Sequence, residues 1–271
     1  MRIIIFTDLD GTLLDHDDYS YEAALSSLKR IKEEEIPLII TTSKTRREVE
    51  WVQRRMGIGG PFIVENGGGI FVPASSGLKG INGGERKGRY TFIRLGKSYR
   101  EIRELFGKIA SRFAIKGFGD MTIAEIAALT DLSEKEAGRA SLREFTEPFL
   151  TRNDGDISAI EKYALSMGVK VAKGGRFYHL TDVNQDKGAA VRKIIDIYKS
   201  NWRPAIVSSI GIGDSENDLP MLEEVDIPVY IPNPQSSHQA FSLPGLVRAK
   251  EPGSRGWNRA VESILNRIDK K

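Results

Sequence analysis

Short apolar runs alternate with amphipathic helical patterns in the first part of the chain. Residues 2–7 form a β-branched apolar run, and residues 37–42 and 61–65 have the same character. A helical pattern with apolar residues three or four positions apart spans 22–32, and a second one begins at Thr45 with capping-box spacing. Strands that are apolar on both faces and alternate with helices predict an α/β fold with a Rossmann-like, doubly wound parallel sheet.

The pattern changes beyond residue 85. Residues 75–88 are rich in Gly, Ser and Lys, a composition typical of a hinge. Strand and helix patterns then cluster without the earlier alternation, beginning with a strand at 90–95. We therefore expect an α+β cap inserted at 86–182 into a core that consists of residues 1–85 and 183–271.

Two acidic segments follow predicted strands of the core. Asp8 and Asp10 come directly after the first strand, and the segment Gly213-Asp-Ser-Glu-Asn-Asp218 follows an apolar strand at 205–211. Ligands of doubly wound sheets bind at the carboxyl ends of the strands, where these carboxylates can converge. Adjacent carboxylates repel one another, and this arrangement invites a divalent cation.

The composition limits the kinds of site that the chain can form. Among 271 residues there are no cysteines and three histidines, which excludes disulfides, thiolate metal sites and a cysteine nucleophile. Carboxylate ligands without thiols or nearby imidazoles favour Mg²⁺.

Charge and hydropathy bear on the partners and the location. The 40 Lys and Arg residues are scattered and nearly balance 37 Asp and Glu residues, so no basic stripe indicates binding to nucleic acid. The apolar runs are shorter than the ~20 residues of a membrane span, and the chain opens on a strand rather than a leader. We expect a cytoplasmic protein without a nucleic-acid or membrane partner, and the sequence does not indicate an oligomeric state.

Further residues complete a phosphate-directed pattern. Lys187 opens a helical segment, where it can neutralise both a phosphate oxygen and a carboxylate, and Thr41-Thr-Ser43 places hydroxyls at the end of the second strand. With the acidic segments, these motifs resemble, in order and spacing, the four motifs of the haloacid-dehalogenase superfamily of phosphatases. The resemblance implies the following roles: Asp8 as nucleophile, Asp10 as general acid and base, Thr42 or Ser43 as the phosphate-binding hydroxyl, Lys187 as the bridge between nucleophile and phosphate, and Asp8, Asp10 (through its main-chain carbonyl), Asp214 and Asp218 at Mg²⁺.

A finer resemblance covers nearly the whole chain. It is carried by Ser43-Lys-Thr-Arg46, Glu65-Asn-Gly-Gly68, Gly117-Phe-Gly-Asp120, Arg143-Glu-Phe-Thr-Glu-Pro-Phe149, Gly174-Gly-Arg-Phe-Tyr-His179 and Gly211-Ile-Gly-Asp-Ser-Glu-Asn-Asp218. These segments are similar to those of the mannosyl-3-phosphoglycerate phosphatase family. The resemblance implies a phosphosugar substrate, mannosyl-3-phosphoglycerate, which is hydrolysed to mannosylglycerate, a compatible solute, and phosphate.

Several residues are candidates for binding that substrate. Lys44 lies beside the predicted phosphate loop. Asn66-Gly67 is expected to form a tight hairpin turn, and this turn can also present amides and the Asn66 side chain to the sugar. Strand alternation separates Arg176 from His179, and we select Arg176 because its planar guanidinium binds a carboxylate through two hydrogen bonds. Arg143 is a second candidate on similar grounds, whereas the acidic run Asp15-His-Asp-Asp18 is expected to be a solvated surface segment.

Other activities fit the same pattern. Glucosyl-3-phosphoglycerate, or another small sugar phosphate, differs too little from the mannosyl ester for these motifs to distinguish them. A phosphohexomutase-type phosphotransferase would pass the phosphoryl group to a sugar instead of water. A non-catalytic phosphosugar-binding protein has no need of Asp8, Asp10, Lys187 and Asp214 together.

Overall fold

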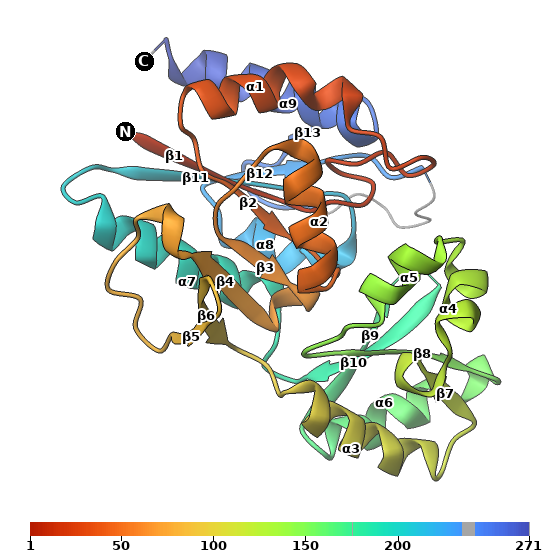
Figure 1. Ribbon diagram of the computed structural model, residues 1–271. Helices are drawn as coiled ribbons and strands as arrows, with labels where there is room; N and C mark the ends of the chain where they lie inside the picture. The colour runs from red at the N-terminus through yellow and green to blue at the C-terminus, as the bar shows by residue number, and fades with distance from the viewer. Residues whose placement is uncertain (175, 235–241, 271) are drawn as a thin grey trace.

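The computed structural model describes residues 1–174, 176–234 and 242–270, and it contains two separate sheets (Figure 1). The main sheet has nine strands in the order β13-β12-β11-β1-β2-β3-β4-β6-β5. The strands from β13 to β3 are parallel, and β4, β6 and β5 pair antiparallel at one edge. The bounds are β1 (Arg2–Thr7), β2 (Leu38–Thr41), β3 (Phe62–Val64), β4 (Gly69–Pro73), β5 (Glu85–Lys87), β6 (Tyr90–Arg94), β11 (Val207–Gly213), β12 (Ile227–Tyr230) and β13 (Val247–Arg248).

Helices cover both faces of the main sheet, which explains the uninterrupted apolar runs of its central strands. In β1, Ile5 packs toward the helices of one face, and Ile4 and Phe6 pack toward those of the other. The first face carries α1 (Leu25–Glu33), α2 (Arg46–Met56) and α9 (Gly253–Ile268), and the second carries α7 (Lys187–Asn201) and α8 (Leu219–Glu223). The predicted doubly wound α/β core is therefore confirmed.

The second sheet is antiparallel and has the strand order β7-β8-β10-β9. We call residues 97–182, which build this sheet and its helices, the cap. Its strands are β7 (Ile115–Gly117), β8 (Glu147–Thr151), β9 (Val169–Gly174) and β10 (Phe177–Asp182), and its helices are α3 (Tyr99–Ala110), α4 (Ile123–Thr130), α5 (Glu134–Ala140) and α6 (Ile157–Leu165). Helices α3 and α6 pack on one face of the sheet, while α4 and α5 pack on the other, where α5 approaches α2 of the core (Figure 1).

Local sequence signals locate most helix starts correctly. Thr45, Thr122 and Ser133 each precede a glutamate by three residues, the spacing that predicts a capping box, and all three boxes are present. In a capping box the two residues satisfy each other's free backbone N–H groups, so the signal is complete within four residues.

Two expectations need correction. The strand at 90–95, expected in the cap, lies in the main sheet as β6, because its buried Tyr90, Phe92 and Ile93 complete the core on both faces. The segment 244–256, whose Pro and Gly content predicts a surface loop, contains the short strand β13 and the first turn of α9. Short strands such as β13 lack a sequence signal of their own and form because a neighbouring strand offers free backbone groups.

None of the helices in the described ranges combines the length and the apolar composition that crossing a bilayer requires.

Candidate active site

The candidate site lies where β1 and β11 end side by side. These strands are parallel neighbours, and the backbone N–H of Asp8 still donates to the carbonyl oxygen of Ile212 at 2.9 Å. Asp8 follows the last residue of β1, and Asp214 follows the last residue of β11. The topology therefore brings together two carboxylates that are separated by about 200 residues in the sequence.

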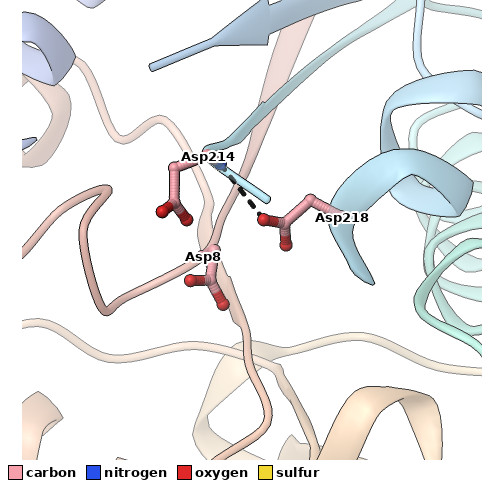
Figure 2. A group of neighbouring side chains, drawn as sticks. All are labelled: Asp8, Asp214 and Asp218. Atoms are coloured by element: carbon pink, nitrogen blue, oxygen red, sulfur yellow. Dashed lines mark hydrogen bonds between the residues drawn. The ribbon is translucent and has the colours of Figure 1, made fainter. Parts of the chain in front are cut away.

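Asp8, Asp214 and Asp218 form a buried acidic group (Figure 2). Each offers a carboxylate oxygen within 4.8 Å of the other two, and the three residues are 7, 3 and 0% exposed. Burial raises the pKa of Asp8 well above its usual value; Lys187 opposes this rise, and the charges of Asp218 and Asp214 add to it. The group offers only oxygen donors, and the negative charge of its three carboxylates exceeds the single positive charge of Lys187. Both features fit a divalent metal ion.

The side chain of Asp214 is held by two hydrogen bonds and lies close to Gly11. Thr12 Oγ1 donates to Asp214 Oδ1 at 3.1 Å, and Asn233 Nδ2 donates to Oδ2 at 2.7 Å. Gly11 has a φ of +72°, and a Cβ at this position would lie 2.7 Å from Asp214 Oδ2. Only glycine fits there, because both the conformation and the space exclude a side chain.

Asp218 combines a local and a distant contact. Its Oδ2 accepts hydrogen bonds from the backbone N–H groups of Asp214 and Ser215, both at 3.1 Å, and from the Ser215 hydroxyl at 3.0 Å. Its Oδ1 faces the ammonium group of Lys187 at 2.5 Å. Ser215 and Asp218 have the spacing of a capping box in the sequence, the structure contains this box, and it leaves one carboxylate oxygen of Asp218 directed at the site.

Lys187 begins α7 and points into the acidic group. Its Nζ lies 2.8 Å from Asp8 Oδ1, and the side chain is fully buried. Burial by itself would lower the pKa of Lys187, but Asp218 and Asp8 more than offset this effect, so the pKa lies above its usual value. The lysine therefore stays positively charged beside Asp8.

Asp10 and Lys44 form a pair at the edge of the acidic group. Lys44 Nζ lies 2.9 Å from Asp10 Oδ2 and 3.9 Å from Glu48 Oε1. Asp10 Oδ1 is buried without a hydrogen-bond partner in the structure. The side chain of Asp10 is thus outside the Asp8–Asp214–Asp218 group, and a metal role through its main-chain carbonyl remains a prediction.

The Thr42–Lys44 loop follows β2. Thr42 is 1% exposed, and its Oγ1 accepts a hydrogen bond from the Lys44 backbone N–H at 3.2 Å. Ser43 is partly exposed, and its carbonyl oxygen accepts a hydrogen bond from Arg143 at 3.1 Å. These contacts leave the choice between the Thr42 and Ser43 hydroxyls open.

Asn66 and Gly67 form a tight turn between β3 and β4. The Asn66 backbone N–H donates to the Thr42 carbonyl oxygen at 2.9 Å, and Asn66 Oδ1 accepts from Asn217 Nδ2 at 3.4 Å. A Cβ on Gly67 would lie 2.0 Å from the carbonyl oxygen of Asp186, so this turn packs directly on the start of α7. The turn lies against three segments of the site, and contact with a sugar remains a prediction.

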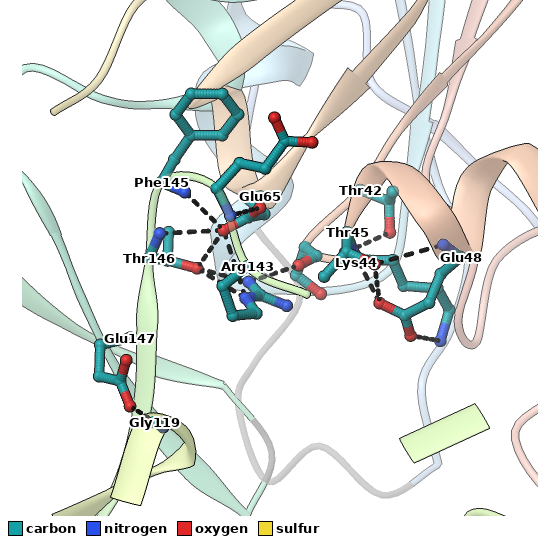
Figure 3. A network of polar contacts seen from close by, with 12 residues as sticks. Thr42, Lys44, Thr45, Glu48, Glu65, Gly119, Arg143, Phe145, Thr146 and Glu147 are labelled. Atoms are coloured by element: carbon teal, nitrogen blue, oxygen red, sulfur yellow. Dashed lines mark hydrogen bonds and ion pairs between the residues drawn. The ribbon is translucent and has the colours of Figure 1, made fainter. Parts of the chain in front are cut away.

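The two candidate arginines differ in their surroundings. The Arg143 side chain is 4% exposed and is bound to Glu65, Thr146 and the Ser43 carbonyl (Figure 3). The Arg176 side chain is 63% exposed, and it pairs with Asp131 at 2.6 Å on the cap. Gly175, the second glycine of that motif, is outside the described residues. Substrate contact by either arginine remains a prediction.

Two histidines occupy structural positions near these groups. Burial, and to a lesser degree the charge of Arg143, lowers the pKa of His179 to about 3, so it is neutral at physiological pH. His16, expected to be solvated, lies 3.7 Å from Asp214, and its neighbour Asp15 accepts hydrogen bonds from Ser254 at the start of α9. The expectation of a solvated run is therefore wrong for these two residues, while Asp17 and Asp18 are exposed.

A cavity of about 120 Å³ lies beside the Asp10–Lys44 pair, between core and cap. Its core wall includes Tyr19, Lys44 and Trp51, and its cap wall includes Leu132 and Arg139. The mixture of aromatic and charged side chains resembles the lining of sites for small polar molecules.

A model of the haloacid dehalogenase-like hydrolases matches residues 5–78 and 130–241, which contain every residue of the acidic group and Lys187. The chain belongs to this family. The match confirms the predicted superfamily, and together with the phosphatase relatives below it confirms the predicted enzyme class, a phosphoric monoester hydrolase.

Two relatives indicate the place of the chain within this family. A glucosyl-3-phosphoglycerate/mannosyl-3-phosphoglycerate phosphatase of Persephonella marina is 49% identical, with 99% of both chains covered. A mannosyl-3-phosphoglycerate phosphatase of Pyrococcus furiosus is 35% identical over 84% of this chain and 90% of its own length.

Solved structures support the fold. A protein of Thermoplasma acidophilum has a TM-score of 0.68 at 17% identity, with 98% of this chain and 99% of that chain covered. The sucrose-phosphatase of Synechocystis, solved with sucrose and phosphate, has a TM-score of 0.59 at 16% identity, with 97 and 98% covered. At this identity the likeness shows that the fold of the family is shared, core and cap included.

Three side chains that contribute to the site were not predicted from the sequence. Asn233 and Thr12 orient Asp214, and Glu65 binds Arg143. Glu65 carried a detectable signal, because a carboxylate at the end of a fully apolar strand is unusual unless it is paired.

Proposed function

We propose that this protein is a metal-dependent phosphatase that hydrolyses both mannosyl-3-phosphoglycerate and glucosyl-3-phosphoglycerate. The observation that carries the proposal is the 49% identity over 99% of the chain to a phosphatase named for both esters. The lysine-bridged acidic group at the ends of β1 and β11 supplies a matching site. The sequence motifs indicated the mannosyl ester as the substrate, and we now propose both hexosyl esters as substrates.

The reaction proposed for this site has two chemical steps. Asp8 attacks the phosphorus atom, the bond to the glycerate oxygen breaks, and Asp10 donates a proton to that oxygen. Asp10 then removes a proton from water, which attacks the aspartyl phosphate and releases phosphate with regeneration of Asp8. Lys187 and the hydroxyl of Thr42 or Ser43 stabilise the negative charge on the phosphate oxygens.

We propose Mg²⁺ as the metal, held by Asp8, Asp214 and Asp218 together with the Asp10 carbonyl. It would offset the negative charge of the phosphoryl group and of the acidic group. The three carboxylates and the lack of thiols fit this hard cation. A cytoplasmic location agrees with this assignment and remains a prediction.

We propose that the chain divides into a core and a cap, with the cap beginning after β6 instead of at residue 86. The hexosylglycerate group of the substrate would extend from Asp10 toward the cavity between the two parts. Lys44, Asn66, Gly67, Arg143 and Arg176 are the candidate residues for its recognition. A cap that covers this group would also exclude solvent from the phosphoryl group.

A substrate panel tests the proposal. Phosphate release is measured with Mg²⁺ on both hexosyl-3-phosphoglycerates, on a hexose phosphate and on a small aryl phosphate. The proposal expects kcat/KM to be highest on the two hexosyl esters. A higher value on the hexose phosphate would overturn the substrate, and transfer of labelled phosphate to an added sugar instead of water would favour a phosphotransferase.

Replacing Asp214 with alanine is expected to raise the Mg²⁺ concentration needed for half-maximal activity by about tenfold or more, since a metal ligand is lost. Chelation should remove activity from the unchanged protein, and added Mg²⁺ should restore it. Asp226→Ala provides a control, because Asp226 binds Ser209 outside the site. Full activity in excess chelator, after the metal content has been measured, would contradict the metal assignment.

Replacing Asp10 with asparagine is expected to lower the rate of phosphoenzyme formation on the hexosyl esters by about 100-fold or more but on an activated aryl phosphate by much less, because only the alkoxide needs a proton to leave. The rate of phosphoenzyme formation on both substrates is measured by rapid quench. Equal losses on the two substrates would argue against Asp10 as the general acid.

A further inference from the structure

Glu65 is a buried carboxylate for which the proposed reaction has no use. It follows β3, is 0% exposed, and has a φ of +51°, an unusual conformation for a residue with a side chain. A fully buried carboxylate in a strained position is costly unless its contacts compensate for it. The contacts of the Glu65 side chain therefore indicate its role.

The Glu65 carboxylate binds one short segment of the cap. Its Oε1 accepts a hydrogen bond from the backbone N–H of Glu144 at 2.7 Å. Its Oε2 accepts from the N–H groups of Phe145 and Thr146 at 3.1 and 2.9 Å, and from the Thr146 hydroxyl at 2.8 Å. A carboxylate of the core thus holds three consecutive backbone N–H groups of the cap, just before β8 (Figure 3).

Arg143 extends this contact to the Thr42–Lys44 loop. Its Nε lies 3.2 Å from Glu65 Oε2, and its Nη2 donates to the Ser43 carbonyl oxygen at 3.1 Å. Both charges of the pair are buried, with 4 and 0% of the side chains exposed. The pair therefore fixes the distance between the cap segment 143–146 and the loop proposed to bind phosphate.

The backbone of Glu65 ties the same point to the core. Its N–H donates to the Lys44 carbonyl oxygen at 3.0 Å, and its carbonyl oxygen accepts from Gln185, in the segment that returns from the cap to α7. Each polar atom of Glu65 is thus bonded, and its partners come from the phosphate loop, the cap and the returning segment.

We propose that Glu65 is a positioning residue that holds the cap at a fixed distance from the phosphate loop, so that the cap can bind the hexosylglycerate part of the substrate. This inference rests on the proposed function. Glu65 acts through Arg143 and the 144–146 backbone and does not touch the reacting groups. Other contacts also join core and cap: the buried Thr45 hydroxyl donates to the Arg139 carbonyl oxygen at 2.9 Å, and the Glu144 side chain pairs with Arg46 and Lys87. Glu65 differs from them because its carboxylate binds three consecutive backbone N–H groups of the cap.

The proposal separates two kinds of substrate. The phosphate loop is held by main-chain bonds that do not need the Glu65 side chain, among them Thr42 N–H to Ile63 carbonyl at 3.1 Å and Asn66 N–H to Thr42 carbonyl at 2.9 Å. A small aryl phosphate uses this loop but has no group that reaches the cap. Loss of the Glu65 carboxylate should therefore affect the hexosyl ester and spare the aryl ester.

Glu65→Gln is the test variant, because it keeps the size of the side chain and replaces one acceptor oxygen with an NH₂ group. Glu147→Gln is its matched control. Glu147 is also a fully buried carboxylate. It pairs with Arg103 at 3.3 Å, and it accepts a hydrogen bond from the backbone N–H of Gly119 at 2.8 Å. Both partners of Glu147 belong to the cap, and Figure 3 shows the contact with Gly119.

Kinetics are measured for both variants on a hexosyl-3-phosphoglycerate and on the aryl phosphate. For Glu65→Gln we expect KM on the hexosyl ester to rise about tenfold or more, with kcat and the aryl phosphate kinetics changed by less than about threefold. Glu147→Gln should keep both KM values within about threefold even where its thermal stability falls. Thr146→Val removes one hydrogen bond to Glu65, so KM on the hexosyl ester should rise by a smaller factor, again without a change on the aryl phosphate. This variant replaces Glu65→Gln in the test if Glu65→Gln does not fold.

Equal losses on the two substrates, no loss on either, or the same pattern in Glu147→Gln would overturn the positioning role. Wild-type protein that hydrolyses only the aryl phosphate would instead refute the proposed function. In that case amide hydrogen exchange tests the positioning role. We expect faster exchange in α5 in Glu65→Gln but not in Glu147→Gln, because α5 packs on α2 of the core and is not itself bonded to Glu65. Unchanged exchange in α5 would overturn the positioning role.

Discussion

Asp8→Asn is expected to lower the rate of phosphate release by at least about 1,000-fold, because an amide does not form the acyl phosphate that a carboxylate forms. The volume of the side chain scarcely changes. The substitution also removes a buried negative charge that Asp218 and Asp214 repel, so we expect the fold to remain intact. Phosphate release and circular dichroism of the purified variant give the two measurements.

Asp182→Asn is the matched control for this variant. Asp182 is equally buried, at 7% exposure, and it also lies 2.8 Å from a lysine, Lys97. Asp182 ends β10, and its partner Lys97 also belongs to the cap, so this pair is separate from the acidic group of the core. We expect this control to keep most of its activity, and near-normal activity of Asp8→Asn would reject Asp8 as the nucleophile.

Lys187→Met is expected to lower kcat by about 100- to 1,000-fold, the typical effect of removing one group that stabilises charge in the transition state. It should also destabilise the metal-free protein by about 3–5 kcal/mol at neutral pH, because two buried carboxylates lose the cation between them. Steady-state kinetics and urea unfolding in chelator measure the two effects. Added Mg²⁺ should restore part of the stability, since it provides positive charge at the same place.

Lys116→Met is the control for the lysine substitution. Lys116 pairs with Glu125 at 2.6 Å, but about half of each side chain is exposed. Exposed pairs contribute about 0–1 kcal/mol, so the control should change neither activity nor stability to a comparable degree. Similar behaviour of the two variants would show that Lys187 does not act through its buried position between Asp8 and Asp218.

The local sequence determined most of the core elements and the location of the acidic segments. The central strands could be predicted because a parallel strand covered by helices on both faces must be apolar throughout, as Arg2–Thr7 nearly is. The helix starts at Thr45, Thr122 and Ser133 could be predicted because a capping box lies within four residues. Asp8 and Asp214 could be placed at one edge because the carboxyl ends of parallel strands share that edge.

The tertiary structure decided the contacts between segments that are distant in the sequence. The sequence placed β6 in the cap, but the apolar faces of this strand are equally suited to either sheet, and its pairing with β4 assigns it to the main sheet. Lys44 was predicted to face the substrate, and its partner in the structure is Asp10. A basic residue beside a loop does not reveal which carboxylate will be within reach.

Glu65 and Arg143 illustrate the same limit in the site itself. They are 78 positions apart and belong to core and cap, so no local spacing relates them. Their pairing depends on how the cap is placed against the phosphate loop, which the packing of the complete chain determines. The residue types at the ends of the strands thus follow from the sequence, whereas the partner of each buried charge follows only from the tertiary structure, because ion pairs form between whichever charges folding brings together.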